Sequence, residues 1–572
     1  MPDPIAPTTR SRSTPAWWQG AVFYQIYPRS FADGNGDGIG DFPGMTARLD
    51  YLRDLGVDAL WLSPHYPSPF VDCGYDISDY TDVGPEYGTL DDFVTFLREA
   101  HAHDIRVVLD LVLNHTSDQH PWFVESRSGR DSPRRDWYVW RDGRGDGPPN
   151  NWASIFGGSA WQLDDASGQF YYHAFLPEQP DLNWRNPDVK AAMWKAVRFW
   201  LELGVDGFRL DAIATIYEDP ALPDHTLPVS ADEILDANRL PEPERLRLLA
   251  YQREQPGVHD LMKELRALLD TYPGDRVLIG ESENLAFHGS GDDEIHLVFN
   301  FPLINTPRLT PEHVRGNQAM RLAAIPAGAW PCNTLGNHDS SRVRSRYADG
   351  AHDVALAKLH AGLILTLKGT PFLYNGEEIG MTDLVLTSFD QLRDHAAVAE
   401  YRRMIGRLGV PAEQALASVV TTTRDRCRTP LQWRNEPNAG FSPPDAATWL
   451  PVNPNYADGV NVDDQEDEPG SVLRFYRRLL ATRRATPALA LGDYVAFDDE
   501  ADEILSFWRD DPVTGQRCLV ALNFSAERRP VAIDVDHSRV RVVFAEPETA
   551  DALMPPGSVN LEPFGMVIAE VV

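Results

Sequence analysis

The sequence predicts an α/β protein: a (β/α)8 TIM barrel with an inserted subdomain B after the third strand and a C-terminal antiparallel β domain. Three observations support this fold class. Short apolar runs rich in β-branched and aromatic residues alternate with amphipathic segments of helical period. A long polar, Gly-rich stretch interrupts the alternation after the third run. Near the C-terminus the pattern changes to strands separated by turns, which is typical of an antiparallel sheet.

Eight strands are expected for the barrel. They are residues 21–26, 57–62, 105–112, 205–210, 277–280, 296–301, 333–335 and 371–374. Between them, residues 90–103, 189–203 and 261–269 carry apolar positions three or four apart, as helices packed on a sheet do. In a barrel of this kind the catalytic side chains lie at the C-terminal ends of the strands.

The same pattern divides the chain into regions. The barrel is expected to comprise residues 17–113 and 186–489, with subdomain B at 114–185 because no plain connection needs that length. A second long loop or subdomain, 381–443, follows the eighth strand. The C-terminal β domain is expected at 490–572. Its strands are predicted at 504–508, 517–523, 531–535, 540–543 and 566–571.

Composition limits the classes of partner. The chain has 572 residues and a formal net charge of −33, so we expect neither nucleic acid nor an anionic membrane as a partner, and small neutral substrates are favoured. It has no apolar run of membrane-spanning length, and its polar, Pro-rich N-terminus predicts no secretory signal. Four widely spaced cysteines fit a reducing compartment. We therefore expect a cytoplasmic location, while the oligomeric state stays open.

Charged residues gather at the ends of four predicted strands. Arg209 and Asp211 end the fourth strand two positions apart, so both point to one side, and the arginine favours the ionised carboxylate. The other residues at strand ends are Asp110, Asn114, His115, Glu281, His338 and Asp339. Paired carboxylates across a scissile bond are the equipment of glycoside hydrolysis, one as nucleophile and one as general acid and base. No nucleotide-binding motif accompanies them, and no organic cofactor is expected.

An acidic loop follows the first strand. The run DGNGDGIGD places oxygen donors at every second position, and Gly38 permits a sharp bend, as in the first part of an EF-hand loop. Gly44 stands where that loop would carry its bidentate glutamate. The run predicts a structural Ca²⁺ or Mg²⁺ site, with a bare Asp/Gly turn as the alternative. Its residues are Asp33, Asn35, Asp37, Ile39 and Asp41.

The chain carries the motifs QIYPRSF, DLVLNH, GFRLDA, GNHD and QPDLN. They resemble the signature blocks of glycoside hydrolase family thirteen, the α-amylase superfamily, and the resemblance covers roughly residues 17–572. QPDLN, GYDISDY and RTPLQW resemble the oligo-1,6-glucosidase and α-glucosidase branch. The resemblance implies a retaining, exo-acting α-glucosidase that releases one glucose at a time.

By this resemblance Asp211 is the nucleophile, Glu281 the general acid/base and Asp339 the transition-state stabiliser. The residues implied to grip the nonreducing-end glucose are Asp76, His115, Arg209, His338 and Arg428, with Tyr75, Phe156 and Phe175 as aromatic walls. Asp110 is expected to support Arg209 from below the pocket. In the metal loop, Ile39 is expected to bind through its carbonyl.

Ala212, after the nucleophile, bears on the linkage. The branch tends to carry Val there in α-1,6 enzymes, so the small side chain favours short α-1,4 substrates such as maltose. A transglucosylase or a sucrose-acting isomerase remains an alternative, although residues 302–331 lack the Arg-rich aromatic loop of the isomerases. A catalytically inactive binding subunit is a remote alternative, because all three acids are present.

Overall fold

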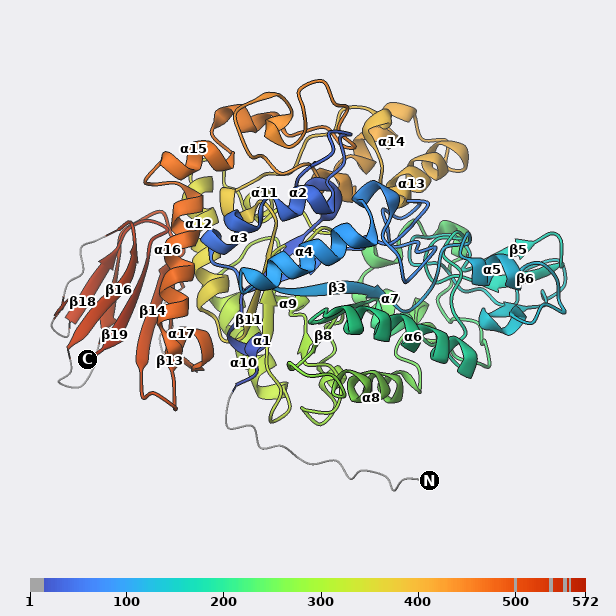
Figure 1. The fold of residues 1–572 in the computed structure, drawn as a ribbon, viewed down its shortest axis with the longest axis horizontal. Coiled ribbons are helices and arrows are strands. Elements are labelled where there is room, and N and C mark those ends of the chain that lie inside the picture. The colour runs from blue at the N-terminus through green and yellow to red at the C-terminus, as the bar shows by residue number, and fades with distance from the viewer. Residues whose placement is uncertain (1–14, 498–501, 534–538, 549–552, 555–556) are drawn as a thin grey trace.

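The computed structural model describes residues 15–497, 502–533, 539–548, 553–554 and 557–572. The polar N-terminal residues 1–14 therefore lie outside the described part of the chain. In Figure 1 the barrel occupies the centre, the inserted subdomain lies on one side and the C-terminal sheet lies on the other. None of the helices within the described ranges combines the length and apolar character needed to cross a membrane.

Eight parallel strands form the barrel, and their pairing confirms the predicted fold class. The order in the sheet is β10-β11-β1-β2-β3-β7-β8-β9. Their bounds are β1 Phe23–Ile26, β2 Ala59–Leu62, β3 Arg106–Val112, β7 Gly207–Asp211, β8 Val277–Gly280, β9 Leu297–Val298, β10 Cys332–Thr334 and β11 Thr370–Tyr374. Nearly every position in these strands is buried, as expected for a parallel sheet with covered faces.

Amphipathic helices cover the outside of the barrel. They include α3 Leu49–Leu55, α4 Leu90–Ala102, α6 Pro187–Leu203, α8 Val258–Leu269, α10 Pro311–Ala324, α12 Asp353–Thr366 and α16 Val472–Ala485. Helix α4 begins with a capping box in which Thr89 accepts from the Asp92 N–H. Helix α6 begins after Asn186 with a proline in its first turn and ends at Gly204, which has φ +110°. Local sequence thus sets both ends of these helices.

The insertion after β3 contains a three-stranded antiparallel sheet. It consists of β4 Trp140–Arg141, β6 Gln169–Tyr172 and β5 Trp161–Asp164, in that order, with helix α5 Pro121–Ser126 beside it. Trp152, Trp161 and Tyr172 form its own small aromatic core. His115 bridges to Asp181, which joins the two ends of the insertion at the barrel mouth.

Two further long connections, called excursions below, lie over the same end of the barrel as subdomain B. The predicted stretch 381–443 contains helices α13 His395–Gly406 and α14 Ala412–Val419. The connection after β7 is also long, and holds the short helices η5 Ala231–Glu233, η6 Ala237–Arg239 and α7 Glu242–Leu248, which the sequence analysis did not single out.

The excursions meet subdomain B at Gly157. This glycine has φ +85°, and a Cβ there would lie 2.3 Å from the Leu235 carbonyl oxygen and 2.4 Å from Arg403 Nη1. Arg403 in turn donates to the carbonyls of Ile234, at 2.8 Å, and Phe156, at 3.2 Å. Only glycine permits three segments to approach this closely.

The C-terminal region is an antiparallel β structure. Six strands pair in the order β12-β13-β14-β19-β16-β17, and β15 pairs with β18. The bounds are β12 Asp493–Ala496, β13 Ile504–Asp510, β14 Arg517–Asn523, β15 Arg529–Ile533, β16 Val540–Glu546, β17 Leu553–Met554, β18 Gly557–Leu561 and β19 Met566–Val571. The predicted strand 531–535 falls in β15, and its last two positions lie outside the described residues.

Candidate active site

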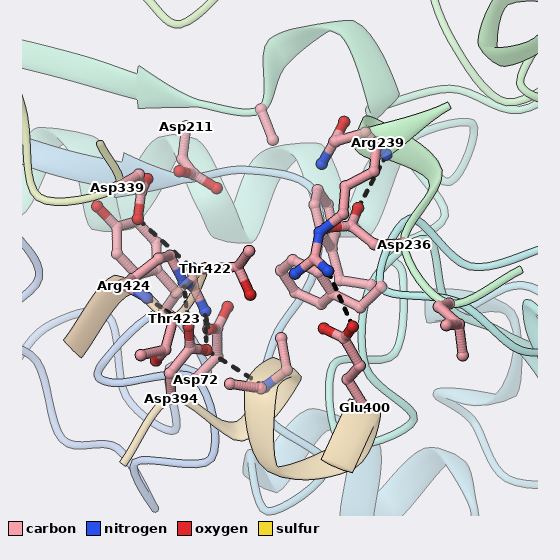
Figure 2. Close-up of a pocket in the computed structure, with 18 of the residues that line it drawn as sticks. Asp72, Asp211, Asp236, Arg239, Asp339, Asp394, Glu400, Thr422, Thr423 and Arg424 are labelled. Carbon is pink, nitrogen blue, oxygen red and sulfur yellow. Dashed lines mark hydrogen bonds and ion pairs between the residues drawn. The ribbon is translucent and has the colours of Figure 1, made fainter. Parts of the chain in front are cut away.

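A cavity of about 390 Å³ opens at the C-terminal ends of the barrel strands (Figure 2). Barrel residues line its floor, and subdomain B and the two excursions line its sides. The lining comprises Asp72, Tyr75, His115, Phe156, Phe175, Asp211, Ala212, Leu235, Asp236, Asn238, Arg239, Glu281, Asp339, Asp394, Ala396, Ala397, Glu400 and Thr422–Arg424. The volume is at the small end of the roughly 300–1,000 Å³ range of small-molecule sites.

One buried guanidinium holds three carboxylates on the cavity floor. Arg209 Nη1 lies 2.8 Å from Asp110 Oδ1 and 2.7 Å from Asp211 Oδ1. Its Nη2 lies 2.9 Å from Glu281 Oε2. Burial raises the pKa of Asp211 above its ordinary value, while the charge of Arg209 pulls it down. Burial likewise raises the pKa of Asp110 to about 6, again against the pull of Arg209. Three acids on one arginine form an acid-rich cluster.

A second cluster surrounds Asp339 and is rich in arginine. Asp339 Oδ1 lies 2.5 Å from Arg428 Nη2 and 3.4 Å from Arg424 Nη1. Burial alone would raise the pKa of Asp339, but the guanidiniums of Arg428 and Arg424 hold it well below its usual range. Because burial lowers the pKa of His338 to about 3, this histidine is neutral near pH 7. The arginines therefore supply the positive charge that keeps Asp339 ionised.

Asp72 and Arg424 line the cavity in place of the pair that the sequence analysis named, Asp76 and Arg428. Asp76 is fully buried, and its oxygens accept from Ser68 Oγ and the N–H groups of Val71 and Asp72 at 2.9 Å each. It therefore does not line the cavity; Asp72, four residues earlier, does.

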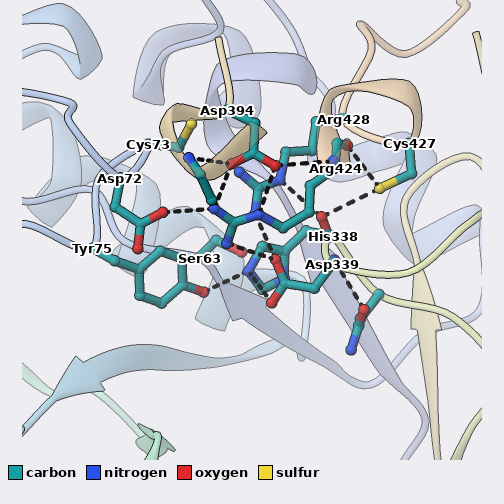
Figure 3. A network of polar contacts seen from close by, with 12 residues as sticks. Ser63, Asp72, Cys73, Tyr75, His338, Asp339, Asp394, Arg424, Cys427 and Arg428 are labelled. Atoms are coloured by element: carbon teal, nitrogen blue, oxygen red, sulfur yellow. Dashed lines mark hydrogen bonds and ion pairs between the residues drawn. The ribbon is translucent and has the colours of Figure 1, made fainter. Parts of the chain in front are cut away.

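Of the two neighbouring arginines, Arg424 lies at the cavity wall and Arg428 lies behind it. Arg424 Nη2 lies 2.7 Å from both Asp72 Oδ1 and Asp394 Oδ1 (Figure 3). Arg428 is fully buried, with its Nε donating to the His338 carbonyl at 2.8 Å. Asp72 and Arg424 each lie a few residues before the motif that carried the prediction, so the motif indicated the correct segment but not the residue that lines the cavity.

The structure brings most of the other predicted residues to the cavity. Tyr75, His115, Phe156 and Phe175 line it, and the Phe156 and Phe175 ring centroids lie 5.5 Å apart. The hydroxyl of Tyr75 is 2.7 Å from His338 Nε2. Arg209 and His338 lie beneath the lining rather than in it, so they position other groups in this structure.

On the opposite side, the excursions contribute charged residues that the sequence analysis did not find. Arg239 Nη1 lies 2.8 Å from Glu400 Oε1, and its Nε lies 3.1 Å from Asp236 Oδ2. Figure 2 shows this group across the cavity from Asp72, Asp394 and Arg424. No motif marks Arg239 or Glu400, because the contact joins segments 161 residues apart.

The acidic loop near β1 is closed by its own hydrogen bonds. Asp41 accepts from the N–H groups of Gly34, Asn35 and Gly44, at 3.1, 3.0 and 2.6 Å. Asp33 accepts from the N–H of Gly36 at 2.6 Å. Among the described residues, no three Asp, Glu, His or Cys side chains converge as a metal site. The donor types still fit a hard cation, since they are carboxylate, amide and carbonyl oxygens.

The fold and the cavity together define a class of protein. Carboxylates from several different strands converge at the mouth of a (β/α)8 barrel around a small, polar, aromatic-walled pocket, which is the arrangement of a glycoside hydrolase.

Comparison with known proteins gives the family. The α-amylase catalytic-domain model matches residues 25–492, so the chain belongs to the α-amylase family. A probable α-glucosidase from Rhizobium meliloti is 44% identical over 89% of this chain and 90% of its own length. An oligo-1,6-glucosidase from Parageobacillus thermoglucosidasius is 39% identical over 91% and 92%.

Among solved structures, a trehalulose synthase from Pseudomonas mesoacidophila superposes with a TM-score of 0.87. It is 38% identical, and the match covers 98% of this chain and all of the other chain.

Proposed function

We propose that the protein is a retaining, exo-acting α-glucosidase that hydrolyses short α-glucosides. The observation that carries the proposal is the bridging of Asp211 and Glu281 by the single guanidinium of Arg209. Direct contact of both acids with one guanidinium favours the short carboxyl separation of retaining enzymes, about 5–5.5 Å, over the wider gap that inverting enzymes need for a water.

In the proposed reaction Asp211 attacks the anomeric carbon and forms a glucosyl ester. Its Oδ1 is occupied by Arg209, which favours Oδ2 as the attacking atom. Glu281 gives its proton to the leaving oxygen and afterwards takes one from the water that hydrolyses the ester. Asp339 stays ionised throughout and stabilises the positive charge that develops on the sugar ring.

Exo action is supported by the closed side of the cavity. The Asp72–Arg424–Asp394 network leaves polar groups where the hydroxyls at the nonreducing end of a glucose would lie, and a charged acid–arginine wall suits them. On the opposite side of the cavity, the close contacts at Gly157 and the Arg239–Glu400 ion pair hold subdomain B and the two long connections together. This arrangement leaves room for a short aglycone rather than a polymer.

The small Ala212 side chain favours an α-1,4 linkage such as that of maltose. Relatives with other activities keep the transfer alternative open: one matched structure is named as an α-glucosyl transfer enzyme, with 37% identity and a TM-score of 0.84 over 98% of this chain and all of that chain. Transfer uses the same glucosyl ester but passes the sugar to another hydroxyl group.

A substrate panel tests the proposal. Purified protein is incubated with maltose, isomaltose, sucrose, trehalose and starch, and products are separated over time, with the anomeric form of the released glucose followed by NMR. Release of α-glucose from maltose, with starch slow, supports the proposal. Initial β-glucose would contradict retention, and a rearranged disaccharide from sucrose would favour the transfer alternative.

Two further assignments belong to this proposal. Asp33, Asn35, Asp37, Asp41 and the Ile39 carbonyl would hold a Ca²⁺ or Mg²⁺ whose part is structural, a role supported by their oxygen donors. A cytoplasmic location is supported by the four cysteines, which are buried free thiols.

A further inference from the structure

The turn after Asp211 holds Ala212 in a left-handed conformation. Its φ is +44° and its ψ is +40°. A non-glycine residue there costs roughly 1–3 kcal/mol, so surrounding contacts must hold it in place. Thr215 makes those contacts: its N–H donates to the Ala212 carbonyl at 3.0 Å, and its hydroxyl donates to the same oxygen at 2.8 Å. Thr215 is only 4% exposed, so water competes little for these bonds.

The left-handed turn directs the Ala212 N–H at Glu281. This N–H donates to Glu281 Oε2 at 2.9 Å, and Arg209 Nη2 contacts the same oxygen at 2.9 Å. A proton on Oε2 would face two N–H donors, so this oxygen acts only as an acceptor. Within the described part of the chain, the hydrogen bonds of Glu281 reach Oε2. A proton on Glu281 is therefore expected on Oε1.

We propose that Thr215 is a positioning residue for Glu281. Its hydroxyl locks the Ala212 turn, the turn fixes Oε2, and Oε1 is left as the oxygen that exchanges the proton. This inference rests on the proposed general acid/base role of Glu281. In the first half-reaction Asp211 bonds to the anomeric carbon, the glycosidic bond breaks, and the leaving oxygen takes that electron pair and the proton from Oε1. In the second half-reaction water gives a proton to Oε1 and its oxygen bonds to the anomeric carbon, while the ester bond breaks and its electron pair returns to Asp211.

The test is Thr215→Val, which removes the hydroxyl with little change in shape. We compare kcat/KM for maltose, whose leaving group needs a proton, with that for α-glucosyl fluoride, whose leaving group needs little help. The expected result is a fall of at least fivefold in the maltose-to-fluoride ratio, together with a displaced alkaline limb in the pH profile of kcat/KM for maltose.

Three further variants sharpen the test. Thr215→Ser keeps the hydroxyl and is expected to recover the ratio. Ala212→Gly on the Thr215→Val background is expected to restore part of it, because glycine enters the left-handed region without the lock. Thr366→Val is the matched control: this fully buried hydroxyl donates to the Gly362 carbonyl at 2.6 Å, in a helix away from the cavity. Its ratio should match the wild type.

The possible outcomes separate the two proposals. Equal losses of kcat/KM on both substrates in Thr215→Val, with an unmoved pH profile, would mean that Thr215 only supports the fold and would overturn the inference. Wild-type kcat/KM on both substrates in Thr215→Val would overturn it as well. Failure of the wild-type protein to release glucose from either substrate would instead refute the proposed function itself.

Discussion

The two charged clusters of the cavity differ in how many guanidiniums contact one carboxylate. Around Arg209, one guanidinium serves Asp110, Asp211 and Glu281. Around Asp339, Arg424 and Arg428 both contact one carboxylate through its Oδ1. Carboxyl groups that share one guanidinium can change protonation, whereas two guanidiniums on one carboxylate fix its negative charge. Proton transfer is therefore expected at the first cluster, and substrate grip and charge stabilisation at the second.

The largest expected effect comes from the acid-rich cluster. Asp211→Asn removes the nucleophile, and we expect kcat/KM for maltose to fall by on the order of 10⁴-fold or more with the fold intact. Glu281→Gln removes the proton donor, and the loss on maltose should be about 10²–10⁴-fold but much smaller on α-glucosyl fluoride. Near-normal turnover of maltose by either variant, with an unchanged circular dichroism spectrum, would refute these roles.

An intermediate effect is expected at the arginine-rich cluster. Arg424→Lys keeps the charge but loses the fork that reaches Asp72 and Asp394 together, so KM for maltose should rise about 10–100-fold. Arg426→Lys is the control, because Arg426 does not line the cavity and pairs with Asp383 at 3.1 Å. A similar change of KM in both variants would show that the loop as a whole, and not the grip of Arg424, was disturbed.

A smaller effect is expected at the acidic loop, which belongs to neither cluster. If Asp33–Asp41 binds Ca²⁺, removal by EDTA should lower Tm by a few degrees, since a ligand at about 100 times its Kd stabilises by about 2.7 kcal/mol. Asp37→Asn should weaken this dependence. Tm is followed with and without added Ca²⁺; a wild-type Tm indifferent to both treatments would establish the bare turn.

The smallest effect is a pH dependence that distinguishes the clusters. The pKa of Asp110 in the folded protein is about 6, above its unfolded value, so its contribution to stability is complete below about pH 4 and declines as pH rises through 6. Relative to wild type, Asp110→Asn should therefore gain on the order of 1 °C in Tm between pH 4.5 and pH 8. For Asp339→Asn the Tm difference should stay constant there, because the pKa of Asp339 lies well below this range. Parallel curves for the two variants would contradict the contrast.

The sequence predicted the barrel and its floor because both depend on short-range patterns. Strand β7 carries Arg209 and Asp211 at a spacing of two, which alone places them on one side. Glu281 and Asp339 each follow a recognisable strand end. The catalytic roles of these residues remain predictions, whereas their convergence on one cavity is observed for Asp211, Glu281 and Asp339.

The side walls of the cavity could not be predicted in the same way. Whether Asp72 or Asp76 lines the cavity depends on a tight loop in which Asp76 accepts from the N–H groups of Val71 and Asp72, and the motif does not reveal this direction. The Arg239–Glu400 pair depends on how two long connections fold over the barrel, which is a matter of tertiary packing rather than local period.

The close approach at Gly157 also has a bearing on protein engineering. Subdomain B, the connection after β7 and helix α13 touch at this one residue, where no space remains for a methyl group. A chimaera that imports one of these segments from a relative would meet the unmatched surfaces of the other two. Grafting a new aglycone preference onto this scaffold is therefore expected to succeed when the three segments are exchanged as a set, and to yield insoluble or inactive protein when they are exchanged singly.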